Sequence, residues 1–185
     1  MEMTKKRIAI LAADGYEKSE LEAPFKALKD SGFEVDVISL NKEPIKAWSN
    51  GNWDGEHTVD HILSEVNSKD YDGLMLPGGV INPDLLRKDK KAVEFVNSFF
   101  KSDMQKPVAA ICHAPWTLAE AGVLKGRKIT SYGSIKTDMK NAGANWVDEA
   151  VVVDRGLVTS RSPEDMDVFI SKMIEEYKEG KHARK

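Results

Sequence analysis

Short apolar runs alternate with longer amphipathic stretches along this chain, and the alternation severely restricts the possible folds. Apolar, strand-like runs occur at residues 7–12, 34–40, 71–76 and 107–111. Stretches of helical periodicity separate them, so the strands are expected to lie parallel, joined by helices that cross over a sheet. We therefore predict an α/β fold, a three-layer sandwich of a mostly parallel sheet with helices on both faces.

Several other segments have recognisable limits. Apolar residues repeat at helical spacing over residues 21–28, where Pro24 is expected to delay the start of the helix or to bend it. Ser162 as N-cap and Pro163 at the first helical position mark the start of the last helix. Further predicted elements are helices at 91–102 and 135–142, a strand at 128–131, and a hairpin of 151–154 with 157–160.

The composition gives no sign of an affinity for charged polymers. The 185 residues fit one domain, 1–185, with a frayed tail expected at 180–185. The net charge of −3 provides no cationic surface, so neither nucleic acid nor membrane is an expected partner. No apolar run approaches the roughly 20 residues that span a bilayer, and the first residues lead directly into a strand, so we expect a cytoplasmic protein.

Cysteine and histidine usage limits the possible chemistry. The single cysteine, Cys112, excludes an intramolecular disulfide and a cysteine-rich zinc cluster, so it is either an inert core residue or a reactive one. His57 and His61 have the spacing of neighbours on one helical face, but no third ligand lies near them at motif spacing. We therefore expect no metal and no cofactor.

The run AAICHAP at residues 109–115 is typical of a nucleophile at a sharp strand-to-helix turn. Such a turn needs small neighbours two residues before and after the nucleophile, and Ala110 and Ala114 meet that need. Pro115 suits the first turn of the following helix. Cys112 would then lie at a helix N-terminus, and we expect the pKa of its thiol to be below the ordinary value.

Two further segments are expected at the same carboxyl edge of the sheet. The run LPGG at residues 76–79 ends a strand, and its N–H groups could form an oxyanion hole with the N–H of His113; a simple tight turn is the alternative. Glu17 lies in the polar loop after the first strand. The irregular stretch 45–55 carries Trp48 and Trp53, which we expect to line a pocket, to cover a subunit contact or to fold onto the sheet edge.

Taken together and in order, these motifs resemble the ThiJ/PfpI family, which includes PfpI-type intracellular proteases. The resemblance spans about residues 6–177 and implies a flavodoxin-like sandwich of the class I glutamine amidotransferase type. The matching segments are residues 16–17, 76–79, 110–115, 122–127, 130–132, 141–148, 151–154 and 159–161.

The resemblance also implies roles for individual residues. Cys112 would be the nucleophile, the carboxyl of Glu17 would be protonated and hydrogen-bonded to its sulfur, and His113 would be the general base and acid. Gly79 and His113 would form the oxyanion hole. The acid that orients the histidine would come from a neighbouring subunit, and its position is Asp84, where the family usually has glutamate. Gly78, Trp116 and Tyr132 are pocket candidates, with Trp116 standing where a polar residue is common.

The implied activity is that of a cofactor-free cysteine hydrolase or lyase that works as a homo-oligomer with a shared site. Its substrate would be either a peptide or a small reactive carbonyl, as in a glutathione-independent glyoxalase or deglycase. In both cases the thiolate adds to a carbonyl carbon. The alternatives are a stress-responsive redox sensor or chaperone-like protein with an oxidisable Cys112, and a buried, purely structural thiol.

Overall fold

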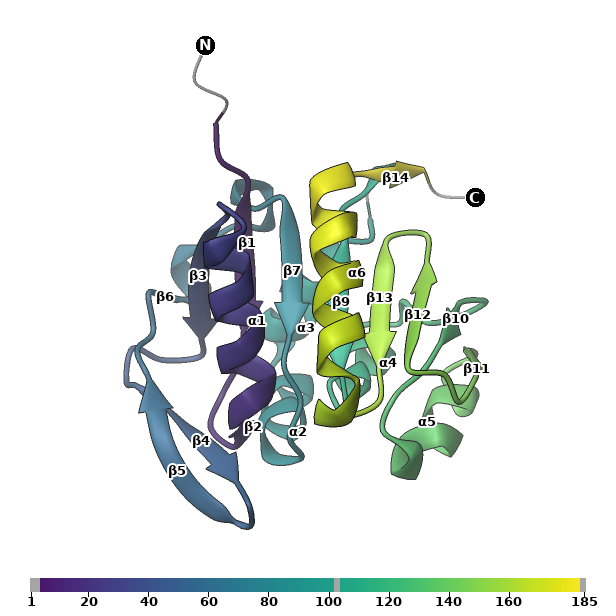
Figure 1. Ribbon diagram of the computed structural model, residues 1–185, viewed down its shortest axis with the longest axis horizontal. Coiled ribbons are helices and arrows are strands. Elements are labelled where there is room, and N and C mark those ends of the chain that lie inside the picture. Colours follow the sequence, from purple (N-terminus) through teal and green to yellow (C-terminus); the bar gives the residue numbers. More distant parts are fainter. Residues whose placement is uncertain (1–3, 102–103, 184–185) are drawn as a thin grey trace.

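A computed structural model describes residues 4–101 and 104–183, which form a central sheet covered on both faces by helices (Figure 1). Seven strands form the sheet in the order β12-β13-β9-β7-β1-β3-β6, and β12 alone among them runs antiparallel to its neighbour. The bounds are β1 Arg7–Leu11, β3 Glu34–Ser39, β6 His61–Ile62, β7 Gly73–Leu76, β9 Val108–Ile111, β12 Val151–Asp154 and β13 Leu157–Ser160. The predicted mostly parallel sheet is thus confirmed.

Helices cover the two faces because successive strand residues point to opposite sides. In β1, Ile8 and Ile10 contribute to a core beneath α1 and α6, whereas Ala9 and Leu11 contribute to a core beneath α3 and α4. The helix bounds are α1 Lys18–Asp30, α2 Ile81–Lys88, α3 Lys90–Ser98, α4 Pro115–Glu120, α5 Lys136–Asn141 and α6 Met166–Glu179. This arrangement confirms the predicted flavodoxin-like sandwich.

Short elements complete the described part of the chain. The small strands are β2 Tyr16–Glu17, β4 Ile45–Ser49, β5 Asn52–His57, β8 Met104–Gln105, β10 Lys128–Ile129, β11 Asn145–Trp146 and β14 His182–Ala183. The 3₁₀ turns are η1 Leu63–Glu65, η2 Ser68–Asp70, η3 Gly133–Ile135 and η4 Pro163–Asp165. No helix among residues 4–101 and 104–183 has the length and apolarity needed to cross a bilayer.

The stretch predicted to be least regular is an antiparallel hairpin of β4 and β5. Trp48 and Trp53 pair across it with ring centroids 5.1 Å apart, and Trp53 remains 53% exposed. The hairpin extends away from the main sheet (Figure 1), and the two rings meet edge to face. Aromatic pairing across the strands explains how a polar, glycine-containing segment becomes regular.

Three other local expectations are corrected. The first helix is not delayed by Pro24, because α1 begins at Lys18 and continues through the proline. Residues 180–185 were expected to fray, but β14 pairs with β8, while 184–185 lie outside the described residues. His57 and His61 lie on β5 and β6 rather than on one helical face.

We predict that Gly73→Ala destabilises the fold by about 1–3 kcal/mol through overpacking. A Cβ at residue 73 would lie 2.9 Å from two ring atoms of Tyr177 and 3.1 Å from Ile8 Cδ1. Both neighbours are buried, and the Tyr177 hydroxyl donates a hydrogen bond to the carbonyl of Leu74, so the ring has little freedom to move. Urea unfolding of both proteins measures the difference. Gly133→Ala is the matched control, because no atom lies within 4 Å of that Cβ, and equal losses for the two variants would contradict the prediction.

Candidate active site

Cys112 lies in the sharp turn between β9 and α4, at the carboxyl edge of the sheet. Its φ of 64° is left-handed backbone, which is uncommon for a residue with a side chain. Two hydrogen bonds hold this conformation: its N–H donates to the Ser160 carbonyl over 3.1 Å, and its carbonyl accepts from the Tyr132 N–H over 2.9 Å. The side chain is 7% exposed. The predicted nucleophile turn is thus present, and its strain is the kind that is stored at functional sites.

The turn after β7 approaches Cys112 so closely that only glycine fits there. A Cβ on Gly78 would lie 2.7 Å from Cys112 Cβ and 2.5 Å from Glu20 Oε1. Gly79 adopts φ 79°, and its N–H, like that of His113, donates toward the Cys112 sulfur. The glycines therefore serve a close approach as well as a tight turn, with two N–H donors where an oxyanion hole was expected.

Glu20, rather than Glu17, places its carboxyl on the Cys112 sulfur. The Glu20 side chain is fully buried, hydrogen-bonds to the thiol and accepts the Gly78 N–H over 3.0 Å. Glu17 directly precedes α1, and its N–H donates to the Gly78 carbonyl over 3.3 Å. The expected hydrogen bond from Glu17 to the sulfur is therefore corrected.

A signal for Glu20 was present in the sequence. Glu20, Pro24 and Leu28 are spaced four residues apart, so they share the buried face of α1. An acidic residue within that apolar stripe needs a specific partner, and the partner is the Cys112–Gly78 pair. The position was missed because the start of the helix was placed too late.

Burial controls the protonation of this pair. Burial, with a smaller contribution from the charge of Glu17, raises the pKa of Glu20 to about 8, so its carboxyl is mostly protonated at neutral pH. Burial and the charge of an ionised Glu20 raise the pKa of the Cys112 thiol, against the N–H groups of Gly79 and His113, which lower it. The lowered thiol pKa expected from the helix terminus is thus corrected. A protonated Glu20 removes its own repulsion and can donate to the thiolate, so the two groups titrate together.

His113 also contacts the Cys112 sulfur. Its Nδ1 lies 3.1 Å from Cys112 Sγ and its Nε2 lies 3.2 Å from Ser134 Oγ. The ring stacks on Tyr132 at 4.7 Å and meets the edge of Trp116 at 5.0 Å. Burial lowers the pKa of His113, so the imidazole is neutral at neutral pH and able to accept a proton. Ser134 was not among the residues expected at the site.

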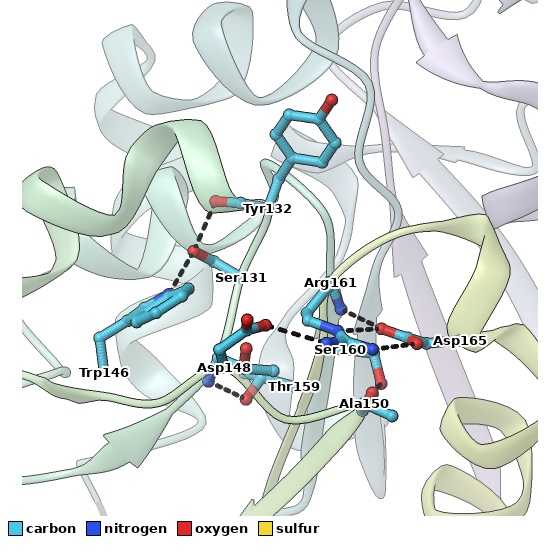
Figure 2. Close-up of polar contacts among 10 residues, drawn as sticks. Ser131, Tyr132, Trp146, Asp148, Ala150, Thr159, Ser160, Arg161 and Asp165 are labelled. Carbon is cyan, nitrogen blue, oxygen red and sulfur yellow. Dashed lines mark hydrogen bonds and ion pairs between the residues drawn. The ribbon is translucent and has the colours of Figure 1, made fainter.

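The wall that carries Tyr132 is fixed by side-chain bonds from neighbouring segments (Figure 2). Trp146 Nε1 donates to Ser131 Oγ over 2.9 Å, and Ser131 Oγ donates to the Tyr132 carbonyl over 3.0 Å. The Thr130 N–H donates to Thr159 Oγ1 over 3.0 Å. The segment before η3 is therefore tied both to β11 and to β13.

Within one chain, Asp84 pairs with a neighbour on its own helix. It is on helix α2, and its carboxylate pairs with Arg87 at 2.7 Å while remaining 58% exposed. The Arg87 guanidinium lies over the Trp116 ring at 4.5 Å, and Trp116 Nε1 donates to Asp138 over 2.9 Å. The structure thus brings Cys112, His113, Trp116 and Tyr132 together, but not Asp84.

We predict that Glu20→Gln changes the pH dependence of stability. Because the carboxyl binds its proton more tightly in the folded protein, wild type loses stability as pH rises from about 4.5 through about 8, and Gln has no such loss. Relative to the variant, wild type should lose on the order of 1–4 kcal/mol between pH 5 and pH 9. Urea unfolding under reducing conditions at both pH values measures this loss.

Glu17→Gln is the matched control for this experiment. Its carboxyl is only half-buried, and burial raises its pKa without the further contacts of Glu20, so a smaller change is expected. Parallel stability profiles for wild type and Glu20→Gln would show that Glu20 does not hold its proton in the folded protein.

Comparison with known proteins agrees with this geometry. Residues 6–176 match the DJ-1/PfpI family model. The chain is 41% identical to the putative cysteine protease YraA of Bacillus subtilis, covering 89% of this chain and 94% of that protein. It is 42% identical to protein/nucleic acid deglycase 2 of Escherichia coli, covering 89% and 93%. The crystal structure of Drosophila melanogaster DJ-1beta matches with a TM-score of 0.81 and 30% identity over 95% of each chain. Such relatives support a hydrolase-like enzyme, and the chain belongs to the DJ-1/PfpI family.

Proposed function

We propose that this protein is a cofactor-free cysteine hydrolase that acts on small reactive carbonyl compounds, as a glyoxalase or deglycase does. One observation carries the proposal: the Cys112 sulfur contacts a protonated carboxyl, an imidazole nitrogen and two backbone N–H donors at once. These are the groups needed to ionise a thiol, to stabilise a developing oxyanion and to move a proton between carbon atoms.

In the first step, the thiol proton passes to His113 Nδ1, 3.1 Å away, leaving a thiolate beside an imidazolium. The sulfur then attacks the aldehyde carbon of a substrate such as methylglyoxal. A carbon–sulfur bond forms, and the carbonyl π electrons move to the oxygen, which the N–H groups of Gly79 and His113 can stabilise. The imidazolium returns the proton to that oxygen, which gives a hemithioacetal.

In the second step, the neutral imidazole of His113 takes the proton from the former aldehyde carbon, while the protonated carboxyl of Glu20 gives its proton to the neighbouring carbonyl oxygen, which forms an enediol. The imidazolium then delivers its proton to the neighbouring carbon, and the hydroxyl on the former aldehyde carbon returns a proton to Glu20. The product is a lactoyl thioester of Cys112. Water hydrolyses it to lactate and restores the thiol, so methylglyoxal plus water gives lactate with no external oxidant or reductant.

The burial of Cys112 supports a small substrate over a peptide. A polypeptide would have to bring its carbonyl carbon within about 3.5 Å of the sulfur of a residue that is only 7% exposed, together with the residues on either side. The Gly78 turn and the Tyr132–Trp116 wall flank that sulfur, because both contact Cys112 or His113 directly. A three-carbon aldehyde has no flanking residues to accommodate beside the sulfur.

The proposal includes a homo-oligomer in which Asp84 of the partner subunit orients His113. Two features of α2 and its approach support it. The Asp84 carboxylate is exposed, and within its own chain it pairs with Arg87. Val80 and Ile81, just before it, are 55% and 38% exposed, and such apolar side chains are typical of a surface that is covered on association.

We predict that wild-type protein converts methylglyoxal to lactate without glutathione, and that Cys112→Ser abolishes this turnover while the fold is retained, because the hydroxyl is far harder to ionise. Lactate is measured enzymatically, and peptide substrates are run in parallel. Peptide cleavage without lactate formation would assign the site to a peptidase. Lactate formation by the serine variant at the wild-type rate would show that Cys112 is not the nucleophile.

A mixing experiment tests the shared site. Cys112→Ser and Asp84→Asn are each expected to be strongly impaired, but a mixed assembly pairs an intact cysteine with a donated acid. In a randomly mixed dimer, about a quarter of the sites would be complete, so activity should reappear to about that extent. Light scattering gives the oligomeric state along the same dilution series. If activity does not recover despite confirmed subunit exchange, or if the monomer is fully active, Asp84 is an ordinary surface residue and the site is not shared.

A further inference from the structure

The outer nitrogen of His113 has a partner that no step of the proposed reaction uses. Nδ1 lies 3.1 Å from the Cys112 sulfur, and Nε2 lies 3.2 Å from the hydroxyl oxygen of Ser134. A neutral imidazole carries one proton, and the hydrogen bond made by one nitrogen decides whether the other is a donor or an acceptor. The group at Nε2 therefore determines what Nδ1 can do to the thiol.

Backbone hydrogen bonds link the segment that carries Ser134 to the turn at Cys112. The Tyr132 N–H donates to the Cys112 carbonyl over 2.9 Å, and the Ile135 N–H donates to the Tyr132 carbonyl over 3.2 Å, which closes η3 around Ser134. The bonds from Trp146 through Ser131 to Tyr132 fix the start of the same segment (Figure 2). Ser134 and Cys112 therefore keep a constant separation, although Ser134 itself is at the surface.

The ring of His113 is confined on its face and at its edge. Tyr132 stacks on one face with an interplanar angle of 25°, and Trp116 meets the ring at 62°. These apolar contacts fix the plane of the ring but not the position of its proton, because they offer no strong hydrogen-bond acceptor. Cys112 and Ser134, the polar groups at the two nitrogens, determine which nitrogen carries the proton.

Three charged groups lie near this ring, each in contact with one of its neighbours. Glu20 hydrogen-bonds to the Cys112 thiol, Arg87 lies over Trp116, and Asp138 accepts the Trp116 indole N–H. In the described part of the chain, the side chain that directly contacts Nε2 is Ser134.

We propose that Ser134 is the positioning residue of His113: its hydroxyl accepts the Nε2–H and holds the neutral ring in the tautomer whose Nδ1 lone pair faces the Cys112 thiol. When the thiol proton moves to Nδ1, the S–H bond breaks, an N–H bond forms, and the Nε2–H remains on Ser134 throughout. No rearrangement is then needed between the resting and the charged pair. The reverse arrangement, with Ser134 donating to Nε2, would place a proton on Nδ1 and prevent it from acting as a base.

This role is independent of the assembly, although its consequence for turnover rests on the proposed function. A hydroxyl both accepts and donates. It can therefore accept the Nε2–H and still donate to a carboxylate that a partner subunit brings. Ser134 would supply orientation within one subunit, and Asp84 of the partner subunit would add charge to it.

The test combines a spectroscopic readout with kinetics on the full chain. Nitrogen-15 NMR of the histidine rings, with His113 identified by its absence in His113→Gln, reports the tautomer in wild type, Ser134→Ala and Ser134→Thr. We expect the Nε2–H tautomer in wild type, a mixture of tautomers in the alanine variant and recovery in the threonine variant, which keeps a hydroxyl. The rate of turnover, kcat, for methylglyoxal should fall about threefold to tenfold in Ser134→Ala with little change in KM.

Ser171→Ala, at an exposed serine of α6 away from the site, is the matched control and should leave all readouts unchanged. An Nδ1–H tautomer in wild type, or a wild-type tautomer in Ser134→Ala, would overturn the proposal. Failure of the wild-type protein to form lactate would instead defeat the proposed function, because the tautomer is observed without substrate.

Discussion

The approach of one backbone turn to another is the constraint on which the rest of the site depends. Gly78 lies so close to Cys112 that any side chain there would collide with Cys112 and with Glu20. The parallel pairing of β7 with β9 causes this, since Leu76 lies beside Ala110 and both strands end at the same edge. The same proximity directs the N–H of Gly79 toward the sulfur and gives the Glu20 carboxyl an N–H partner.

Burial determines how the site handles protons. Removing Glu20 from water favours its neutral form, and removing His113 from water favours the neutral imidazole, so at neutral pH the thiol lies between a proton donor and a proton acceptor. Neither property belongs to the residue type alone. An exposed glutamate would be ionised at that pH and would repel a thiolate, whereas the buried one can stabilise it by hydrogen bonding.

Different segments of the chain position the two ring nitrogens of His113. Toward the interior, Nδ1 is placed by the Cys112 turn, which the sheet holds rigidly through the hydrogen bond to Ser160. Toward the surface, Nε2 is placed by η3, which is secured by the Trp146–Ser131–Tyr132 bonds. Asp84 belongs to neither set, because α2 presents it to solvent beside Arg87. Such a division leaves the inner half of the site buried in the sheet edge, whereas Ser134 and Asp84 lie at the surface.

Local pattern alone determined the strand and helix alternation, the turn at Cys112 and the adjacent His113, because these depend on period, small neighbours and proline position within a few residues. It did not determine the β4–β5 hairpin, whose regularity comes from the contact of Trp48 with Trp53 across the strands. The spacing of Glu20 with Pro24 and Leu28 indicated a buried position, but its contact with the Cys112 sulfur was decided by how α1 packs in the tertiary structure. Ser134 reaches His113 across a separation of 21 residues, and a contact at that range is decided by packing, which no local spacing encodes.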